Sequence, residues 1–507
     1  MKIGFQVGLD YETVYLELVA MLHMDIVPYT GQEKLVIIDG AKTIAEAPLE
    51  GGKTYVGYLK NDKMDLHEAL PFSLGALGIR ALQEGFLLEE AAEPRLDLAL
   101  HSLREALMGI SEEPLWYVSA SPWGYPYSVA LTHDLDSLSL REYPVGRTFL
   151  GFIYRSTVGN FRRWCEKKIT AGEFGESLAR SVQALKAKMV GGADAWSEAT
   201  QTMLSLERKR AVFSSLYLMP KSGEPGRALQ DPHETAPSNR AGFYAPAERR
   251  LDLAALEAEG WELGVHGLDA WADAQLGRDE LQAVREVSAQ ATGVRMHWLY
   301  FRTPESWQRI EEAGYFYDTT FGYNEGIGFR AGTLQAFHPL NVQNLWELPL
   351  HIQDGALLGK EHGNLTRAEA LERALELFGF AERLGGTVTL LWHNASFGAP
   401  RFWGSVYERL LTKAQKDRAW LAPGREIIRW YALRRRTKVL IEQKGQILSG
   451  MIQRQAHQPV SGNPPELALF IGIPAERIQA CSASWKKAEK GIIMEAKPGR
   501  FKIELKG

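Results

Sequence analysis

The chain has 507 residues, of which 45% are hydrophobic, and this is enough for a globular protein of about two or three domains. Its formal net charge is −4 and its pI about 6.4, which does not favour nucleic acid as the main partner, because proteins that bind nucleic acid usually carry a basic excess. With only two cysteines, Cys165 and Cys481, a disulfide framework and a zinc site built mainly from cysteines are both excluded.

The N-terminus shows no sign of a targeting segment. Asp10 and Glu12 interrupt it before the sustained apolar core of a signal peptide can form. Nowhere does an apolar run reach the roughly 18 residues that a transmembrane helix needs. We therefore expect no membrane span and a cytoplasmic location.

Residues 1–120 are predicted to form an N-terminal α/β domain of unknown role. The apolar run 34–40 is typical of a strand that ends in a turn, and 96–104 has helix formers at helical spacing. The stretch 121–126 is rich in Pro, Gly and Ser and indicates a linker.

A short acidic run after this linker is the most informative segment of the chain. The apolar residues 127–131 predict a buried strand, and alternation along it places Asp134 and Asp136 on the same face. Two carboxylates at the carboxyl end of a strand suit a metal-plus-base site, since one can hold a cation and the other can take a proton from the metal's water. The alternative interpretation is an ordinary turn or helix cap.

A long helical segment comes next, followed by strands that alternate with helices. Residues 145–210 are amphipathic and charged, and we interpret them as an insertion that forms a lid or an oligomer surface. The strands expected beyond it are 211–218, 262–266, 294–301, 345–350 and 387–393, with helices that include 305–313 and 368–384. This rhythm predicts parallel strands with crossover helices, hence an α/β barrel or a layered sheet.

The pattern changes near residue 432. The run Arg434-Arg435-Arg436 closes a helix, where positive charge complements the helix dipole, and we interpret it as a solvated helix end. Short strands are expected at 438–443, 467–471 and 501–505. They predict a small β-rich C-terminal domain over 433–507.

Three more strands of the central region end in side chains with useful chemistry. His266, Arg302 and His393 each follow an apolar run. In a parallel α/β fold the carboxyl ends of the strands lie on one face, and active sites gather there. We therefore expect these side chains to join Asp134 and Asp136.

In this order the segments resemble the motifs of the polysaccharide deacetylase family, carbohydrate esterase family 4. The matching segments are Thr132-His133-Asp134-Leu135-Asp136 for Thr-Phe-Asp-Asp-Gly, His266 for the start of His-Ser/Thr-x-x-His, Arg302-Thr303-Pro304 for Arg-x-Pro, and Leu391-Trp392-His393 for Leu-x-His. The resemblance is to a bacterial branch with an extra N-terminal domain. It implies a deformed (β/α) barrel over 125–432.

The resemblance also implies a role for each motif residue. Asp134 would be the general base, and Asp136 and His266 would hold a divalent metal, with Zn²⁺ as the expected ion. Arg302 would form an ion pair that keeps Asp134 ionised and oriented, and His393 would be the general acid. The structural alternatives are a surface salt bridge for Arg302 and a strand-end histidine bonded to the backbone for His393.

One position departs from the family pattern. Ala270 stands four residues after His266, where the family has its second histidine. The third metal ligand must therefore come from elsewhere. His297, expected on a neighbouring strand, is the first candidate, and Asp269 and His233 are the alternatives.

These residues imply a hydrolase that removes N-acetyl groups from an amino sugar or a polysaccharide precursor, with an N-acetylated carbohydrate as its partner. Two alternatives remain open. One is a hydrolase of a non-sugar amide of the cyclic ureide type, and the other is a non-catalytic carbohydrate-binding protein with a degenerate site.

Overall fold

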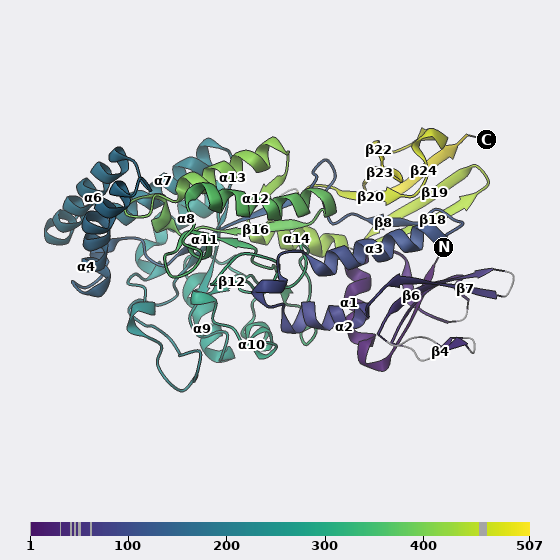
Figure 1. Ribbon diagram of the computed structural model, residues 1–507, viewed down its shortest axis with the longest axis horizontal. Helices are drawn as coiled ribbons and strands as arrows, with labels where there is room; N and C mark the ends of the chain where they lie inside the picture. Colours follow the sequence, from purple (N-terminus) through teal and green to yellow (C-terminus); the bar gives the residue numbers. More distant parts are fainter. Residues whose placement is uncertain are drawn as a thin grey trace.

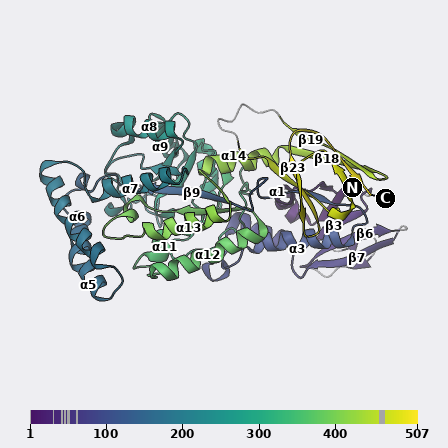
Figure 2. The same cartoon turned by 90° about the horizontal axis from the view of Figure 1, so that it is seen from above.

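The computed structural model describes residues 2–30, 32–40, 43–44, 47–48, 52–60, 63–455 and 464–506. The molecule is elongated (Figure 1), with the helices α4 (Arg147–Tyr154) and α6 (Ala171–Val190) at one end. A parallel sheet with its helices occupies the middle, and the sheets that contain the two termini form the other end. The view from above (Figure 2) shows the same order along the long axis.

A wholly parallel sheet of nine strands forms the middle of the molecule. Its strands are β9 (Ser128–Leu135), β10 (Ser215–Leu218), β11 (Glu262–Gly267), β12 (Gly293–Met296), β13 (Tyr317–Asp318), β14 (Trp346–Glu347), β15 (Ile352–Gln353), β16 (Thr387–Leu391) and β17 (Trp420–Ala422). The strand order is β14-β13-β12-β11-β10-β9-β16-β15, and β17 also pairs with β9. The expected mixed α/β fold is confirmed, with the parallel sheet curved into a half-barrel.

Helices cover this sheet because its strands are apolar on both faces. β9 is buried along its whole length, as expected for a parallel strand between two helical layers. The helices of this region are α7 (Ala195–Lys209), α8 (Arg250–Glu259), α9 (Ala274–Arg285), α10 (Glu305–Ala313), α11 (Asp354–Leu358), α12 (Arg367–Leu384), α13 (Gly404–Lys416) and α14 (Gly424–Arg435). The insertion also contains α5 (Asn160–Cys165), which a π-helical segment, Arg155–Gly159, joins to α4.

The strand expected at 294–301 is shorter in the structure, and the difference matters for the site. β12 ends at Met296 because the next residues turn: Trp298 and Leu299 have φ values of 60° and 50°. Such left-handed backbone is uncommon for bulky residues and ends the extended conformation. The strand expected at 345–350 is also shorter, since β14 has only two residues.

The N-terminal sheet has the order β2-β1-β3-β6-β7, with β1 parallel to β2 and β3, and β6 antiparallel to β3 and β7. Its strands are β1 (Ile3–Val7), β2 (Ile26–Pro28), β3 (Leu35–Asp39), β6 (Thr54–Lys60) and β7 (Lys63–Leu70), and β4 (Thr43–Ile44) pairs with β5 (Ala47–Pro48). The helices α1 (Glu12–Leu22), α2 (Leu74–Ile79) and α3 (Arg95–Ile110) belong to the same region.

The C-terminal region consists of two four-stranded sheets, β18-β19-β24-β21 and β22-β23-β20-β8. Their strands are β8 (Trp116–Val118), β18 (Thr437–Lys444), β19 (Ile447–Arg454), β20 (Leu467–Ile471), β21 (Ile478–Cys481), β22 (Trp485–Ala488), β23 (Gly491–Ala496) and β24 (Gly499–Leu505). β8 comes from the segment before the linker yet pairs antiparallel with β20, because Trp116 and Val118 pack into the same apolar core as Leu469. The N-terminal segment therefore completes a C-terminal sheet.

Candidate metal centre and active site

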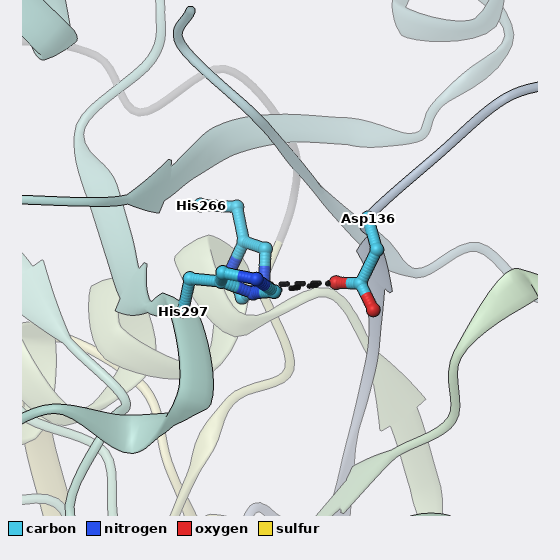
Figure 3. Close-up of side chains that lie close together, drawn as sticks. All are labelled: Asp136, His266 and His297. Atoms are coloured by element: carbon cyan, nitrogen blue, oxygen red, sulfur yellow. Dashed lines mark hydrogen bonds and ion pairs between the residues drawn. The ribbon is translucent and has the colours of Figure 1, made fainter. Parts of the chain in front are cut away.

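Three side chains singled out in the sequence meet at the carboxyl ends of β9, β11 and β12 (Figure 3). His266 Nε2 lies 3.2 Å from Asp136 Oδ1 and 2.8 Å from His297 Nδ1. His297 Nδ1 is 3.5 Å from the same Asp136 oxygen. One carboxylate oxygen and two imidazole nitrogens thus converge on a single point.

The protonation of this cluster suits metal binding. His266 Nδ1 lies 2.9 Å from the carbonyl oxygen of Arg295, so a neutral ring donates there and keeps the Nε2 lone pair toward the cluster. Burial keeps the pKa of His297 well below its usual value, which favours the neutral form of this ring. Burial alone would raise the pKa of Asp136, but nearby histidines, with the charge of His393 the largest effect, outweigh it and hold this pKa below its usual value.

Two imidazoles and a carboxylate form a donor set typical of zinc and similar borderline cations. Ligands about 2.0–2.1 Å from a tetrahedral ion lie about 3.3 Å apart. The separations of 2.8, 3.2 and 3.5 Å in this cluster agree with that spacing to within about 0.5 Å. The residues present therefore fit a single ion with an open coordination position.

Neither of the other two candidate ligands joins this cluster. Asp269 Oδ1 accepts the backbone N–H of Arg227 at 2.6 Å, which turns its carboxylate toward the 226–227 loop. His233 lies on an exposed loop, where its backbone N–H donates to Asp231. Within the described part of the chain, His297 is the group that brings a third ligand atom to Asp136 and His266.

Asp134 lies beside the cluster, 3.7 Å from His266 Nε2 through its Oδ2 atom. Its other oxygen is 3.5 Å from Arg295 Nη1, and both residues are almost completely buried. Arg295 also donates to Thr319, from Nε to the carbonyl oxygen at 2.8 Å and from Nη2 to the hydroxyl at 3.0 Å. A buried, fixed guanidinium therefore faces the carboxylate of Asp134.

The expected ion pair between Arg302 and Asp134 is wrong. Arg302 is exposed, and its Nη2 atom donates to the carbonyl oxygens of Leu229 and Gln230 at 2.5 and 3.0 Å. The physical reason is the early end of β12, because the turn at Trp298 directs the following residues away from the strand ends. Arg295, inside the strand, takes the place beside Asp134.

His393 closes the site on the side of β16. Its Nδ1 atom lies 2.7 Å from Asp354 Oδ1, and its backbone N–H donates to the other oxygen of Asp354 at 3.0 Å. Its Nε2 atom faces the cluster, 3.8 Å from Asp136 Oδ2. Burial lowers the pKa of His393, but the carboxylates of Asp354 and Asp136 outweigh this and raise it to about 9.

Asp134, His266, His297 and His393 line one cavity of about 160 Å³, together with Trp298, Asn324, Gln353 and His362. The turn that presents His297 and Trp298 is fixed from both sides. Arg240 donates to the carbonyl oxygen of His297 at 3.0 Å, and Asn324 donates to that of Trp298 at 2.9 Å. A larger cavity of about 930 Å³ lies between α3 and the C-terminal sheets. Asp134, His266, His297 and His393 are not among its lining residues.

Arg295 and Asp354 are the site residues that the sequence did not reveal. Arg295 carried one signal, a lone charge within an apolar strand, two residues before His297 and so on the same face. Asp354 carried none, because its contact with His393 depends on the pairing of β15 with β16.

Comparison with known proteins gives little beyond this geometry. No family model matches the chain, and no curated protein matches it. Among solved structures, the chain is similar to a crystal structure of a "putative polysaccharide deacetylase from Mycobacterium smegmatis", with 15% identity and a TM-score of 0.37 over 62% of this chain and 94% of the other. A likeness this distant carries no weight for the function, so we base the function on the residues of the site.

None of the helices in the described ranges has both the length and the apolar character that crossing a bilayer requires.

Proposed function

We propose that the protein is a metal-dependent hydrolase that removes N-acetyl groups from an amino sugar or a polysaccharide precursor. The observation that carries this proposal is the convergence of three functional groups on one cavity. They are the Asp136–His266–His297 cluster, a carboxylate paired with a buried arginine, and a histidine paired with a carboxylate.

Asp136, His266 and His297 would hold the ion, which when bound supplies a Lewis acid that polarises the acyl carbonyl and lowers the pKa of water. The second nitrogen of His266 supports this assignment, because its bond to the Arg295 carbonyl fixes the ring orientation.

Asp134 is the proposed general base. Its carboxylate lies beside His266 and lines the cavity, so it can accept a proton from the attacking water. Arg295 faces this carboxylate and limits its rotation, because the guanidinium is itself held by Thr319.

His393 is the proposed general acid. Asp354 holds its Nδ1–H, which leaves Nε2 directed into the cavity, where a departing amine would need a proton. The high pKa of His393 keeps its ring protonated at neutral pH, as an acid requires.

The size of the cavity supports a small acyl group as the part of the substrate that enters it. About 160 Å³ is less than the roughly 300–1,000 Å³ of typical ligand pockets, so the rest of the substrate would remain outside. The carbohydrate part of the proposal comes from the motif resemblance and not from the cavity.

The test is elemental analysis combined with an acetate-release assay on N-acetylated oligosaccharides and a ring-opening assay on a cyclic ureide. We expect about one equivalent of metal in the wild type, its loss in His266→Ala and in His297→Ala, and its retention in His393→Ala. The His393→Ala variant should lose activity by about 10²-fold or more while keeping the ion. Absence of metal from the wild type even after supplementation, or full activity of His393→Ala, would contradict the proposal.

A further inference from the structure

The helical insertion exposes two apolar stripes at helical spacing. The first follows α4, the π-helical segment and α5, and consists of Leu150, Tyr154, Val158, Phe161 and Trp164. The second follows α6 and consists of Leu178, Val182, Leu185 and Met189. Each of these side chains is between 40% and 79% exposed, and successive members are three or four residues apart, so each set lies on one face of its helix.

These stripes lie outside the buried interior of the insertion, and of their members Phe161 and Trp164 also pack on Phe174 of α6, with ring centres 5.9 and 5.4 Å away. Its interior consists of Phe149, Phe152, Ala184 and Ala195, which form a separate buried cluster. The helices of the insertion therefore have two apolar faces. One is buried inside the insertion, and the other is exposed to solvent. Contiguous apolar patches on a protein surface mark interaction sites.

The charge of the insertion differs in sign from that of the whole protein. Residues 147–190 contain nine Lys and Arg and three Glu, a net charge of +6, whereas the whole chain carries −4. Each of the three acids already pairs with a cation: Glu166 with Lys168, Glu173 with Arg367, and Glu176 with Arg180. Exposed basic side chains, among them Arg162, Lys167 and Lys186, therefore flank the apolar stripes.

We propose that the face of α4, α5 and α6 binds the surface of a membrane that contains anionic lipids. Basic residues around exposed Trp, Phe and Leu side chains are the pattern of helices that lie in the membrane interface. Anionic headgroups complement the net charge of +6, whereas a second copy of the chain would bring two faces of like charge together. This inference does not depend on the proposed function.

The position of the insertion allows such docking. Figures 1 and 2 show α6 at the end of the molecule that lies away from both termini, where the rest of the fold does not block it. Its base is fixed to the central region, because Asn160 and Arg163 donate to the carbonyl oxygen of Pro400 at 3.1 and 2.9 Å.

The experiment is sedimentation of the full chain with vesicles of phosphatidylcholine alone or with about one third phosphatidylglycerol. We expect binding to the anionic vesicles only, weakened by salt because the charges are exposed. An apolar variant, Leu150→Gln/Phe161→Gln/Val182→Gln/Met189→Gln, and a charge variant, Arg162→Glu/Lys167→Glu/Lys186→Glu, should each lower the partition coefficient about tenfold or more.

Matched controls change equally exposed residues elsewhere. Leu251→Gln on α8 removes a side chain that is 87% exposed, and Lys416→Glu/Lys438→Glu/Arg500→Glu changes the net charge by the same amount outside the insertion. Both controls should bind like the wild type, and circular dichroism would verify that all variants are folded.

A second measurement places the contact. Cys165 is exposed at the end of α5, so an environment-sensitive fluorophore attached to it in a Cys481→Ser background should brighten with anionic vesicles. Equal binding to both vesicle types would overturn the proposal, as would binding without a response at Cys165. A dimer in light scattering that the apolar variant dissociates, with no vesicle binding, would overturn it in favour of a second copy.

Discussion

The pair formed by Asp134 and Arg295 is a buried charge pair whose two partners depend on each other. Arg295 is fully buried, and its guanidinium lies 5.2 Å from the ring centre of Tyr217. Asp134 Oδ1 and Arg295 Nη1 have no hydrogen-bond partner among the described residues, so their mutual attraction across 3.5 Å is what compensates their burial. Removing either charge leaves the other unpaired in the protein interior.

We therefore expect Arg295→Met to lower kcat by about 10²-fold or more with little change in KM or metal content, because the proposed base loses its orientation. Arg302→Met should stay within about threefold of the wild type, since Arg302 contacts two loop carbonyls and the ring of Trp271 and does not reach Asp134. Steady-state kinetics with elemental analysis test this, and partial recovery in Arg295→Lys would separate lost charge from lost packing. A larger loss of kcat in Arg302→Met than in Arg295→Met would contradict this prediction. It would support the role of Arg302 that the Arg-x-Pro motif implies.

At this scale the sequence predicts well the residues that sit at strand ends. Asp134, Asp136, His266 and His393 follow apolar runs, and the shared edge of a parallel sheet then brings them together. Arg302 fails because its position depends on a two-residue turn, and no local pattern predicts left-handed backbone at a Trp and a Leu.

Among the elements, β15 and β16 are joined through a histidine that must stay neutral. His351 Nε2 lies 3.0 Å from the carbonyl oxygen of Thr333, and its Nδ1 accepts the backbone N–H of Thr389 at 3.1 Å. One ring nitrogen donates and the other accepts, so an extra proton on Nδ1 would face an N–H group. Burial lowers the pKa of His351 to about 4.

This histidine predicts an acid-sensitive part of the stability. Its folded pKa lies below the ordinary value of 6.5, so the unfolded chain takes up the proton first, and stability is full above pH 6.5 and falls toward pH 4. Between pH 7.5 and pH 5.0, this residue should lower the free energy of unfolding by about 2 kcal/mol.

Urea unfolding at these two pH values measures the effect. His351→Gln, whose amide can both donate and accept, should lose about 2 kcal/mol less than the wild type on acidification. The control His67→Gln, on the exposed strand β7, should lose as much as the wild type. An equal loss in His351→Gln and the wild type would show that this ring does not titrate as argued.

Helix α7 is anchored to the sheet by one carboxylate. Glu207 is fully buried and accepts hydrogen bonds from His133 and Trp261 at 2.9 Å, from Ser214 at 2.8 Å and from Tyr407 at 2.5 Å. These partners lie on β9, on α13 and in the segments that precede β10 and β11. A single side chain therefore ties α7 to the strand that carries Asp134.

Glu207→Ala should lower the free energy of unfolding, measured with urea, by about 3–5 kcal/mol. The reason is that it leaves four buried polar groups, one of them a histidine, without their acceptor. Glu408→Ala on α13 is the matched control, since its ion pair with Arg210 is exposed and is worth about 0–1 kcal/mol. A cost below about 1 kcal/mol for Glu207→Ala would mean that water replaces the lost acceptor.

At the scale of the whole molecule, the basic run 434–436 at the end of α14 is not the solvated helix end that the sequence predicts. Arg434 is buried, and Arg435 pairs with Glu17 of α1. The sequence could not reveal this, because the partner segments lie more than 300 residues earlier in the chain. The same reason explains why the sequence does not predict the pairing of β8 with β20: long-range contacts leave no local pattern.

Arg434 connects three parts of the protein at once. Its Nε donates to the carbonyl oxygen of Ser119 at 2.8 Å, and its Nη2 donates to those of Val118 and Met21 at 2.9 and 3.0 Å. These acceptors belong to the residue that follows β8, to β8 itself and to α1. One guanidinium at the end of α14 thus donates hydrogen bonds to carbonyl groups of the N-terminal region. These carbonyl groups lie where that region meets a C-terminal sheet.

Arg434→Met should therefore destabilise the protein by about 3 kcal/mol or more, because the buried carbonyls lose their donor while the volume is retained. Arg436→Met, at a half-exposed position two residues later, should change stability by less than about 0.5 kcal/mol. Thermal and urea unfolding monitored by circular dichroism measure both. Since Arg434 joins the terminal regions to the centre, its loss should also increase proteolysis between residues 119 and 126. Cleavage there without a drop in global stability would mean that Arg434 orders the linker alone and does not hold the regions together.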